Sequence, residues 1–537
     1  MFVLRNILNN CCTDGSVNKM VPGKILTTFA ISFLIIGCLW DNNYNLAQAA
    51  TTTPIKHLVV IFQENVSFDH YFATYPLSSN DPGDPYFQPK ENTPSVNGLS
   101  GALLVDNPNS VKPFRIPREN ASTCDNDHLY TRLQEAYDGG LVDKFVETNV
   151  VSKGCDPAIT MGYFDGGTVT AIWNYAQYFE LSDNFFGSTF GSSTPGHINL
   201  ISGQTHGASP PNLKESGTNF VVNGTLISDA NPIFEECSNV FTKSFPKASL
   251  NGTNIGDLLN QANVTWGWFQ GGFKPTNITA DGKPVCGSAH GIYKGMAIPD
   301  YLPHHEPFQY YNTTANPHHL PPSSIEMIGR TDQANHQYDM SDFWSTLESG
   351  NIPAISFLKD PAFRDGHAGY SNPLNEQTFI VEIINRIQKL PEWNSTAVII
   401  AYDDSDGWYD HVMPPIVSQS DDPLNDKLLG DGLCGTPAAG DYKDRCGYGP
   451  RLPLLIVSPY SKVNYVDHQI TDQTSILKFI EDNWFIGRIG DQSFDEKAGS
   501  ILNMFNFTSG TMPTSSSLIL QKGLLCLPDY VMHHHAN

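Results

Sequence analysis

Three continuous apolar runs constrain the fold of this 537-residue chain more than any other feature of its sequence, and they occupy residues 58–62, 397–401 and 454–457. A run that is apolar at every position, rather than at every second one, is typical of a strand covered on both faces of a parallel sheet. Helical patterns lie between the runs, and a shorter strand candidate occupies residues 355–357. The expected helices are residues 129–146, 168–178, 375–389 and 472–483. Strands that alternate with helices predict an α/β fold, a doubly wound sandwich around a mostly parallel central sheet.

The regions around this core differ from it in composition. Residues 207–345 are rich in Gly, Pro, Asn and aromatic side chains and show little periodicity. We expect them to form a loop-rich insertion or cap over the sheet rather than an independent domain. The main domain is then expected to span residues 51–504, followed by a Ser/Thr-rich tail over residues 505–537.

The first fifty residues resemble an export signal. Lys24 precedes an uncharged, mostly apolar run over residues 25–40, and small residues follow at 47–50. This combination predicts a signal peptide that is cleaved near Ala49 or Ala50, with Met1 or Met20 as the start. A lipoprotein box ending at Cys38 and an uncleaved anchor remain as alternatives. In each case we expect a secreted, cell-envelope or periplasmic protein.

Seven cysteines follow this segment, and none has the C-x-x-C spacing typical of zinc ribbons or thioredoxin-like sites. In an oxidising compartment they predict disulfides. Pairing in sequence order would leave the last one over, but the spacing alone does not fix the connectivity. The seven are Cys124, Cys155, Cys237, Cys286, Cys434, Cys446 and Cys526.

The charge balance excludes one class of partner. The chain has 55 acidic and 31 basic side chains, a formal net charge of −24 at pH 7. A surface this acidic repels phosphate polyanions, so we expect no nucleic-acid partner. No sequence feature indicates an obligate protein partner.

Oxygen-bearing side chains follow two of the apolar runs. Glu64 and Asn65 come just after the first run, and Asp403 and Asp404 come just after the second. Because ligands gather at the carboxyl ends of strands in open α/β sheets, we expect these four side chains to converge. Acidic groups in one crevice repel one another unless a cation neutralises them, so the set predicts a metal site. The alternative is that these acidic residues cap helices or form turns.

A short polar turn and several loop histidines are candidates for phosphate chemistry. Residues 190–199 read F-G-S-S-T-P-G-H-I-N, a tight turn into a helix that exposes a hydroxyl beside backbone N–H groups suited to an anion. The same sequence is also compatible with an ordinary loop. Imidazoles can hold a phosphoryl oxygen, protonate a leaving group or bind a metal, although a single loop histidine usually does none of these. The candidates are His128, His304, His305 and His367.

Residues 63–72 read Q-E-N-V-S-F-D-H-Y-F. This stretch resembles the opening signature of the bacterial phosphoesterase family that joins phosphatidylcholine-type phospholipases C with secreted acid phosphatases, although Val66 replaces the common Arg. The resemblance continues in order through residues 193–196, 365–370, 402–411 and 448–453, and it covers roughly residues 54–490. It implies an alkaline-phosphatase-like fold, which sulfatases share.

The resemblance also implies the roles of individual residues. Ser193 matches the family's nucleophile. The family's metal ligands match Glu64, Asn65, Asp403 and Asp404 together with Ser193. The phosphate-binding and proton-transfer histidines match His128, His304, His305 and His367, of which His304 and His305 lie in the expected insertion. At the fourth motif this chain reads D-D-S-D-G-W-Y-D-H, where many phospholipases C read D-E-H-G-G-F-Y-D-H, and this form resembles the acid-phosphatase branch.

These observations lead to one expected function and three alternatives. We expect a secreted, metal-dependent phosphoric ester hydrolase that acts through Ser193 as an acid phosphatase on phosphomonoesters. Phospholipase C activity on phosphatidylcholine-type diesters is the first alternative. A non-catalytic binding protein would be expected to lose Ser193 or a metal ligand, and a sulfatase would need Arg where this chain has His197. Oxygen ligands favour a hard divalent metal such as Ca, Mg or Mn, whereas the histidines leave Zn open.

Overall fold

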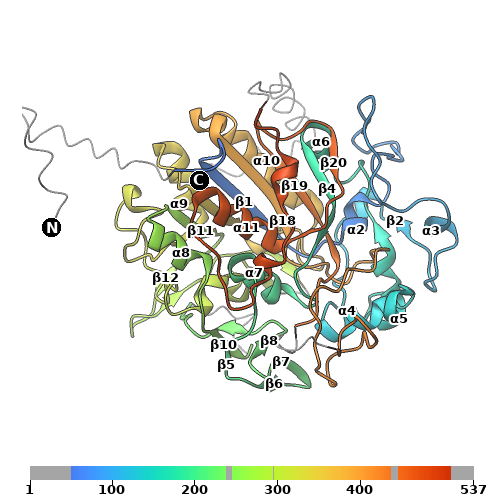
Figure 1. The fold of residues 1–537 in the computed structure, drawn as a ribbon, viewed down its shortest axis with the longest axis horizontal. Helices are drawn as coiled ribbons and strands as arrows, with labels where there is room; N and C mark the ends of the chain where they lie inside the picture. The colour runs from blue at the N-terminus through green and yellow to red at the C-terminus, as the bar shows by residue number, and fades with distance from the viewer. Residues whose placement is uncertain (1–49, 238–244, 294–295, 437–444, 509–537) are drawn as a thin grey trace, which may run out of the picture. The chain divides into compact units, whose positions relative to one another are not determined.

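The computed structural model describes residues 50–237, 245–293, 296–436 and 445–508 (Figure 1). The expected signal peptide, Cys38, Cys526 and most of the expected tail lie outside the described residues.

A nine-stranded sheet forms the centre of the described chain. Within it, only β19 runs antiparallel to its neighbours, and every other described pair is parallel. The predicted α/β class with a mostly parallel central sheet is therefore confirmed. In spatial order the strands are β16 (Gln337–Asp339), β11 (Trp266–Gln270), β17 (Ile355–Lys359), β1 (His57–Gln63), β18 (Thr396–Tyr402), β19 (Arg451–Val457), β4 (Glu180–Phe186) and β20 (Tyr465–Asp467), with β21 (Thr471–Asp472) also beside β4.

The central pair of strands explains the apolar runs of the sequence. β1 pairs with β18 along its whole length, from His57 opposite Thr396 to Gln63 opposite Tyr402. Every residue of β18 is buried, as is every residue of β1 after the first. Because both strands end at the same edge of the sheet, the residues that follow them lie close together.

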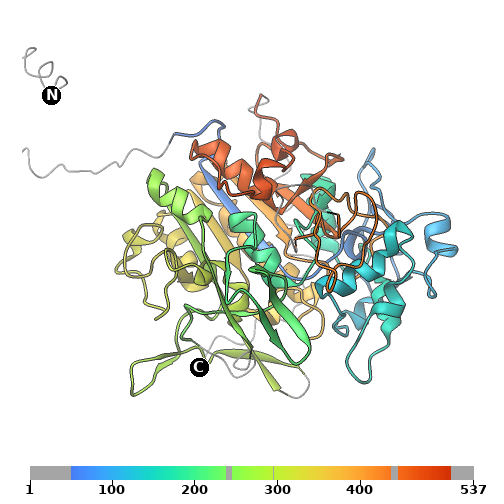
Figure 2. The same ribbon diagram turned by 60° about the horizontal axis from the view of Figure 1, so that its bottom comes forward.

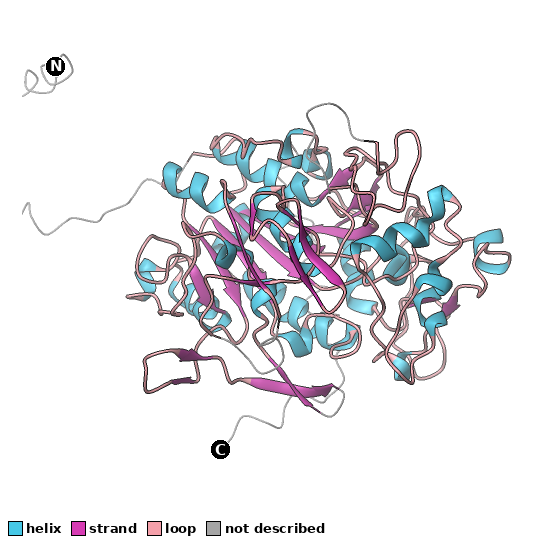
Figure 3. Ribbon diagram, turned by 90° about the horizontal axis from the view of Figure 1, so that it is seen from below, coloured by secondary structure: helices cyan, strands magenta, loops and turns pink. Residues whose placement is uncertain are grey.

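Helices lie on either side of these strands (Figure 3). α7 (Ser193–Ser202) packs against α11 (Gln473–Trp484), and α6 (Thr170–Tyr178) packs against α10 (Pro373–Ile387). Asn372 caps α10 by accepting from the backbone N–H groups of Leu374 and Asn375. The helices α6, α10 and α11 match three of the four expected ones.

The fourth expected helix, over residues 129–146, is not continuous. It forms α4 (Tyr130–Tyr137), a 3₁₀ turn and then α5 (Phe145–Thr148). Asp138 and Gly139 adopt positive φ values of 41° and 63°, which end the first helix. The sequence prediction was wrong here because the apolar spacing continues across this turn.

The range 207–345 contributes more to the sheet than a loop-rich insertion would. Two strands of the central sheet, β11 and β16, come from it, and so do two helices. Outside the sheet it forms the short strands that Figure 2 shows in green. The helices are α8 (Ile255–Ala262) and α9 (Met340–Ser349). The short strands are β5 (Ala208–Ser209), β6 (Leu213–Glu215), β7 (Thr218–Val222), β8 (Thr225–Leu226), β9 (Asn231–Pro232), β10 (Lys247–Leu250), β12 (Asn277–Ile278), β13 (Pro284–Val285), β14 (Ala289–Tyr293) and β15 (Met296–Pro299).

The described chain also contains three disulfides, a buried residue at the start of the expected tail and several short elements. Three disulfides join Cys124 to Cys155, Cys237 to Cys286 and Cys434 to Cys446, which is the sequence-order pairing. Beyond residue 504, Phe505 is buried and stacks on Phe479. None of the described helices combines the length and apolar character needed to cross a membrane. The short elements α2 (Phe68–Phe72), α3 (Ala102–Val105), β2 (Phe114–Arg115) and β3 (Gly162–Tyr163) complete the described structure.

Candidate active site and metal centre

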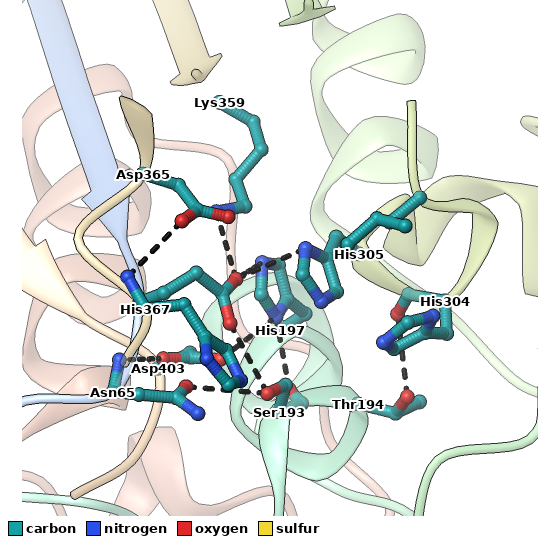
Figure 4. A network of polar contacts seen from close by, with 12 residues as sticks. Asn65, Ser193, Thr194, His197, His304, His305, Lys359, Asp365, His367 and Asp403 are labelled. Carbon is teal, nitrogen blue, oxygen red and sulfur yellow. Dashed lines mark hydrogen bonds and ion pairs between the residues drawn. The ribbon is translucent and has the colours of Figure 1, made fainter. Parts of the chain in front are cut away.

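Four oxygen-bearing side chains meet where β1 and β18 end and α7 begins. Ser193 is the first residue of α7, and its Oγ lies 3.2 Å from Glu64 Oε2, 3.3 Å from Asn65 Oδ1 and 3.2 Å from Asp404 Oδ2. All four residues are buried. Of the four side chains expected to converge, Glu64, Asn65 and Asp404 thus meet around Ser193, and Asp403 lies next to Asn65. Figure 4 shows Asn65, Asp403 and Ser193 side by side.

This arrangement of oxygens has the composition of a cation site. The single hydroxyl proton of Ser193 cannot serve three acceptors, so most of these oxygen pairs face one another without a shared hydrogen. Asp403 lies beside them, and its buried Oδ2 has no hydrogen-bond partner among the described residues. Carboxylate, amide and hydroxyl oxygens are the ligands of hard divalent cations. The residues present therefore fit a divalent metal ion.

Backbone contacts hold the two ligand-bearing loops together. The N–H of Asn65 donates to Asp403 Oδ1 at 2.9 Å, and the N–H of Val66 donates to the Asp404 carbonyl at 2.9 Å. α7 approaches the same loop closely, since a Cβ on Gly196 would lie 2.2 Å from the Asp403 carbonyl oxygen. Glycine at this position lets the helix that carries Ser193 reach the carboxylates.

Three basic side chains surround the other oxygen of Glu64. Glu64 Oε1 lies 2.7 Å from Lys359 Nζ, 3.1 Å from His305 Nδ1 and 3.6 Å from His197 Nε2. Burial alone would raise the pKa of Glu64, but the positive charge of the basic groups around it outweighs burial and holds this pKa well below its usual value. Glu64 is therefore ionised.

His197 and Lys359 were not among the site residues predicted from sequence. His197 lies four residues after Ser193 on α7, so helical spacing places both on one face. Its Nδ1 lies 2.9 Å from the Ser193 carbonyl oxygen, which assigns the hydrogen to Nδ1 and leaves Nε2 facing Glu64. Lys359 is the last residue of β17, so the strand-end rule that selected Glu64 also applies to it.

His128 and His367 form a second group together with Asp406. His128 Nδ1 lies 3.2 Å from Asp406 Oδ1, and its ring centre lies 6.1 Å from that of His367. Burial would lower the pKa of both, but Asp404 and Asp406 raise that of His128 well above the usual value, and Asp125 and Asp406 raise that of His367. Nearby carboxylates therefore favour the protonated form of both imidazoles.

His304 and His305 have the opposite electrostatic character. They lie in the 3₁₀ turn Pro303–His305, and burial lowers the pKa of both. The carbonyl oxygen of His304 accepts from Thr194 Oγ1 at 3.3 Å, which attaches this turn to α7. Burial therefore favours the neutral form of His304 and His305, whereas nearby carboxylates favour the cationic form of His128 and His367.

The two aspartates of the proposed metal site, Asp403 and Asp404, have raised pKa values. Burial, with Glu64 and Asp404 nearby, raises the pKa of Asp403 well above its usual value. Burial likewise raises the pKa of Asp404 to about 7. Without the positive charge of a metal ion, buried carboxyl groups that lie close together repel one another and are harder to ionise. Raised pKa values are therefore expected for carboxyls that hold a metal ion.

Comparisons with known proteins give a family and several distant relatives. A model of the Phosphoesterase family matches residues 55–487. The chain is 23% identical over 465 residues to a non-hemolytic phospholipase C of Pseudomonas aeruginosa, covering 85% of this chain and 58% of the relative. It is 24% identical over 544 residues to phospholipase C B of Mycobacterium tuberculosis, covering 97% of this chain and 92% of the relative. A solved protein of the alkaline phosphatase superfamily from Vibrio parahaemolyticus aligns with a TM-score of 0.29 and 8% identity, covering 85% of this chain and 76% of that one. The chain thus spans only somewhat more than half the length of the Pseudomonas relative.

Proposed function

Because the chain belongs to the phosphoesterase family, we propose that it hydrolyses phosphoric esters with Ser193 as nucleophile and a divalent metal ion as cofactor. The observation that carries this proposal is the convergence of Ser193 Oγ with oxygens of Glu64, Asn65 and Asp404 at 3.2–3.3 Å. The same four residues together with Asp403 would hold the metal. Such an ion would polarise a phosphoryl oxygen and favour the alkoxide form of the serine.

Ser193 is placed to attack phosphorus. It lies at the positive end of the α7 dipole, which favours its alkoxide and a bound phosphoryl group. In the first step the Ser193 oxygen forms a bond to phosphorus while the bond to the ester oxygen breaks. Water then attacks the phosphoseryl group, which releases inorganic phosphate and restores the hydroxyl.

The histidines divide the remaining tasks according to their charge. The cationic His128 and His367 bind phosphoryl oxygens, and one of them protonates the leaving alcohol. We assign the proton transfer to His367, because nearby carboxylates raise its pKa, whereas burial lowers the pKa of the rival candidate His304. His305 and His197 keep Glu64 oriented through its Oε1.

The substrate we propose is a phosphomonoester, in keeping with the acid-phosphatase form of the fourth motif. Phospholipase C activity is the second candidate, because the curated relatives named above are phospholipases C. Three disulfides support an exported protein, since such bonds persist in oxidising compartments.

The test compares Ser193→Ala with Ser192→Ala on p-nitrophenyl phosphate and on phosphatidylcholine, before and after exhaustive chelation. Ser192 is the matched control, since it is equally buried and its Oγ has no hydrogen-bond partner among the described residues. We expect Ser193→Ala to lose on the order of 10³-fold or more in kcat, and Ser192→Ala to keep near-wild-type turnover. If Ser193→Ala hydrolysed the substrates at nearly the wild-type rate, Ser193 would not be the nucleophile. If the protein kept full activity after exhaustive chelation, the reaction would not require a metal ion.

A further inference from the structure

Asp406 is a buried acidic residue of the fourth motif to which the proposed function gives no role. It lies two residues after Asp404 and has a φ of 52°, in the left-handed region that Asp and Asn adopt more readily than most residues. Its side chain contacts both the loop after β1 and the loop that carries His128. Because both loops supply groups of the proposed site, these contacts connect Asp406 to the chemistry.

The first contact orients the side-chain amide of Asn65. Asn65 Nδ2 donates to Asp406 Oδ1 at 3.3 Å, while Asn65 Oδ1 lies 3.3 Å from Ser193 Oγ (Figure 4). An amide has an oxygen on one side and two N–H donors on the other, and only the oxygen can bind a cation. Since a carboxylate oxygen accepts hydrogen bonds, Asp406 favours the orientation in which the Asn65 oxygen faces the proposed metal site.

The same carboxylate oxygen contacts His128. His128 Nδ1 lies 3.2 Å from Asp406 Oδ1 and 3.0 Å from the Asn126 carbonyl oxygen. Because both partners are acceptors, Nδ1 carries a hydrogen, and Nε2 is left for a phosphoryl oxygen. Asp406 thus fixes which nitrogen of this imidazole is available to the substrate.

Neighbouring groups hold Asp406 itself in place. Its N–H donates to Asp404 Oδ1 at 2.6 Å, while Asp404 Oδ2 lies 3.2 Å from Ser193 Oγ. Its other carboxylate oxygen, Oδ2, accepts from Asn126 Nδ2 at 3.5 Å. Asn126 Oδ1 in turn accepts from Asn149 Nδ2 at 2.7 Å. A residue that orients others must have a fixed position of its own, and these contacts supply it.

We propose that Asp406 is a positioning residue, whose carboxylate orients Asn65 toward the metal ion and His128 toward the phosphoryl group. The inference rests on the proposed hydrolysis and adds to it a group that acts through two other residues. One oxygen atom thereby connects the metal ligands with a phosphate-binding histidine. Its loss should impair metal binding and ester hydrolysis in separable ways, which a purely structural role would not do.

The test removes the carboxylate by Asp406→Gly, a change that suits the positive φ. Asp406→Ser, whose side chain is one bond shorter than that of Asp, replaces it if the glycine variant does not fold. Asp406→Asn is the conservative variant, since its amide oxygen can still accept from Asn65 and His128. Asp491→Gly is the matched control, because Asp491 has the same φ of 52° but lies outside the proposed site. Urea unfolding of each variant measures any loss of stability separately.

Metal affinity is measured by calorimetry on the chelated full-length protein, with whichever of Ca²⁺, Mg²⁺, Mn²⁺ and Zn²⁺ the wild type binds most tightly. We expect Asp406→Gly to weaken this affinity about 10–100-fold, the usual cost of losing a group that orients a metal ligand. Asp406→Asn and Asp491→Gly should keep near-wild-type affinity. The proposal is overturned if Asp406→Gly leaves the affinity unchanged, or if Asp406→Asn lowers it as strongly.

The second readout is kcat/KM for p-nitrophenyl phosphate at saturating metal, which isolates the contact with His128. Asp406→Gly should lower it about tenfold in the wild type. In a His128→Gln background the same change should cost much less, because the imidazole that Asp406 orients is then absent. Equal losses in both backgrounds would overturn the proposal. A wild-type protein that binds none of the four ions, or does not hydrolyse p-nitrophenyl phosphate, would instead reject the proposed function and this inference with it.

Discussion

Arg451 joins the first and fourth motifs and supports our most quantitative prediction. Its buried guanidinium donates to Asp410 Oδ2 and Asp69 Oδ1, both at 3.1 Å, and to two backbone carbonyl oxygens at 2.7 and 3.0 Å. Asp69 lies five residues after Glu64, and Asp410 lies six residues after Asp404. The cation therefore holds together the two segments that carry the proposed metal ligands.

Arg451→Met keeps an unbranched apolar stem but removes the charge, so the buried carboxylates of Asp69 and Asp410 both lose their contact with the guanidinium. Breaking a buried ion pair on one side costs about 3–5 kcal/mol, and we expect this loss in the free energy of unfolding. Arg386→Met is the control, because Arg386 pairs with Glu382 at 3.0 Å on the exposed face of α10. An exposed pair of that kind contributes only about 0.3–0.5 kcal/mol.

The assay is urea-induced unfolding followed by tryptophan fluorescence at pH 7. Adding Asp410→Asn to Arg451→Met should recover part of the loss, because one unpaired charge is removed with it. A loss below about 1 kcal/mol for Arg451→Met, or one equal to that of Arg386→Met, would refute the reasoning.

Three further predictions concern other charged groups. Lys359→Met should weaken divalent-metal binding, measured by calorimetry, because Glu64 then loses its 2.7 Å contact and its fixed orientation. In a pH profile of kcat/KM, the wild type should lose activity as pH rises through the raised pKa of His367, and His367→Gln should abolish this alkaline limb. Burial raises the pKa of Glu180 from 4.5 to about 9, so the folded state binds more protons and stability falls as pH rises between these values. Glu180→Gln should therefore stabilise the protein at pH 7 by up to about 3 kcal/mol in urea unfolding and flatten its pH dependence.

The sequence predicted those parts of the fold that depend on local patterns. The runs at 58–62, 397–401 and 454–457 are apolar at every position, and each corresponds to a strand buried on both faces. β11 was missed because it is short, interrupted by Gly267 and set in a region without periodicity. β4 was missed because Ser, Asp and Asn interrupt its apolar character, although nearly all of it is buried. Their burial depends on neighbouring strands that are distant in sequence.

The residues of the proposed site were likewise predicted from sequence only where a local pattern indicated them. Strand ends in the sequence were enough to identify Glu64, Asn65 and Asp404, since the carboxyl ends of parallel strands share one edge. His197 and Lys359 follow from the same rules, helical spacing and a strand end, but a single His or Lys carries no signal of its own. The opposite pKa shifts of His128 and His304 depend on burial and on which carboxylates lie nearby, and sequence spacing gives neither.

The proposed function requires so acidic a protein to bind an anionic ester, and the charge distribution of the site bears on how it would do so. With a net charge of −24, its surface does not attract a phosphate ester. Under the proposed function the attraction must be local, and His128 and His367 would supply part of it. Lys359 is already paired with Glu64, so the carboxylates of the proposed metal site would repel the substrate unless a cation lay among them. The proposed metal is thus needed for binding the ester as well as for cleaving it.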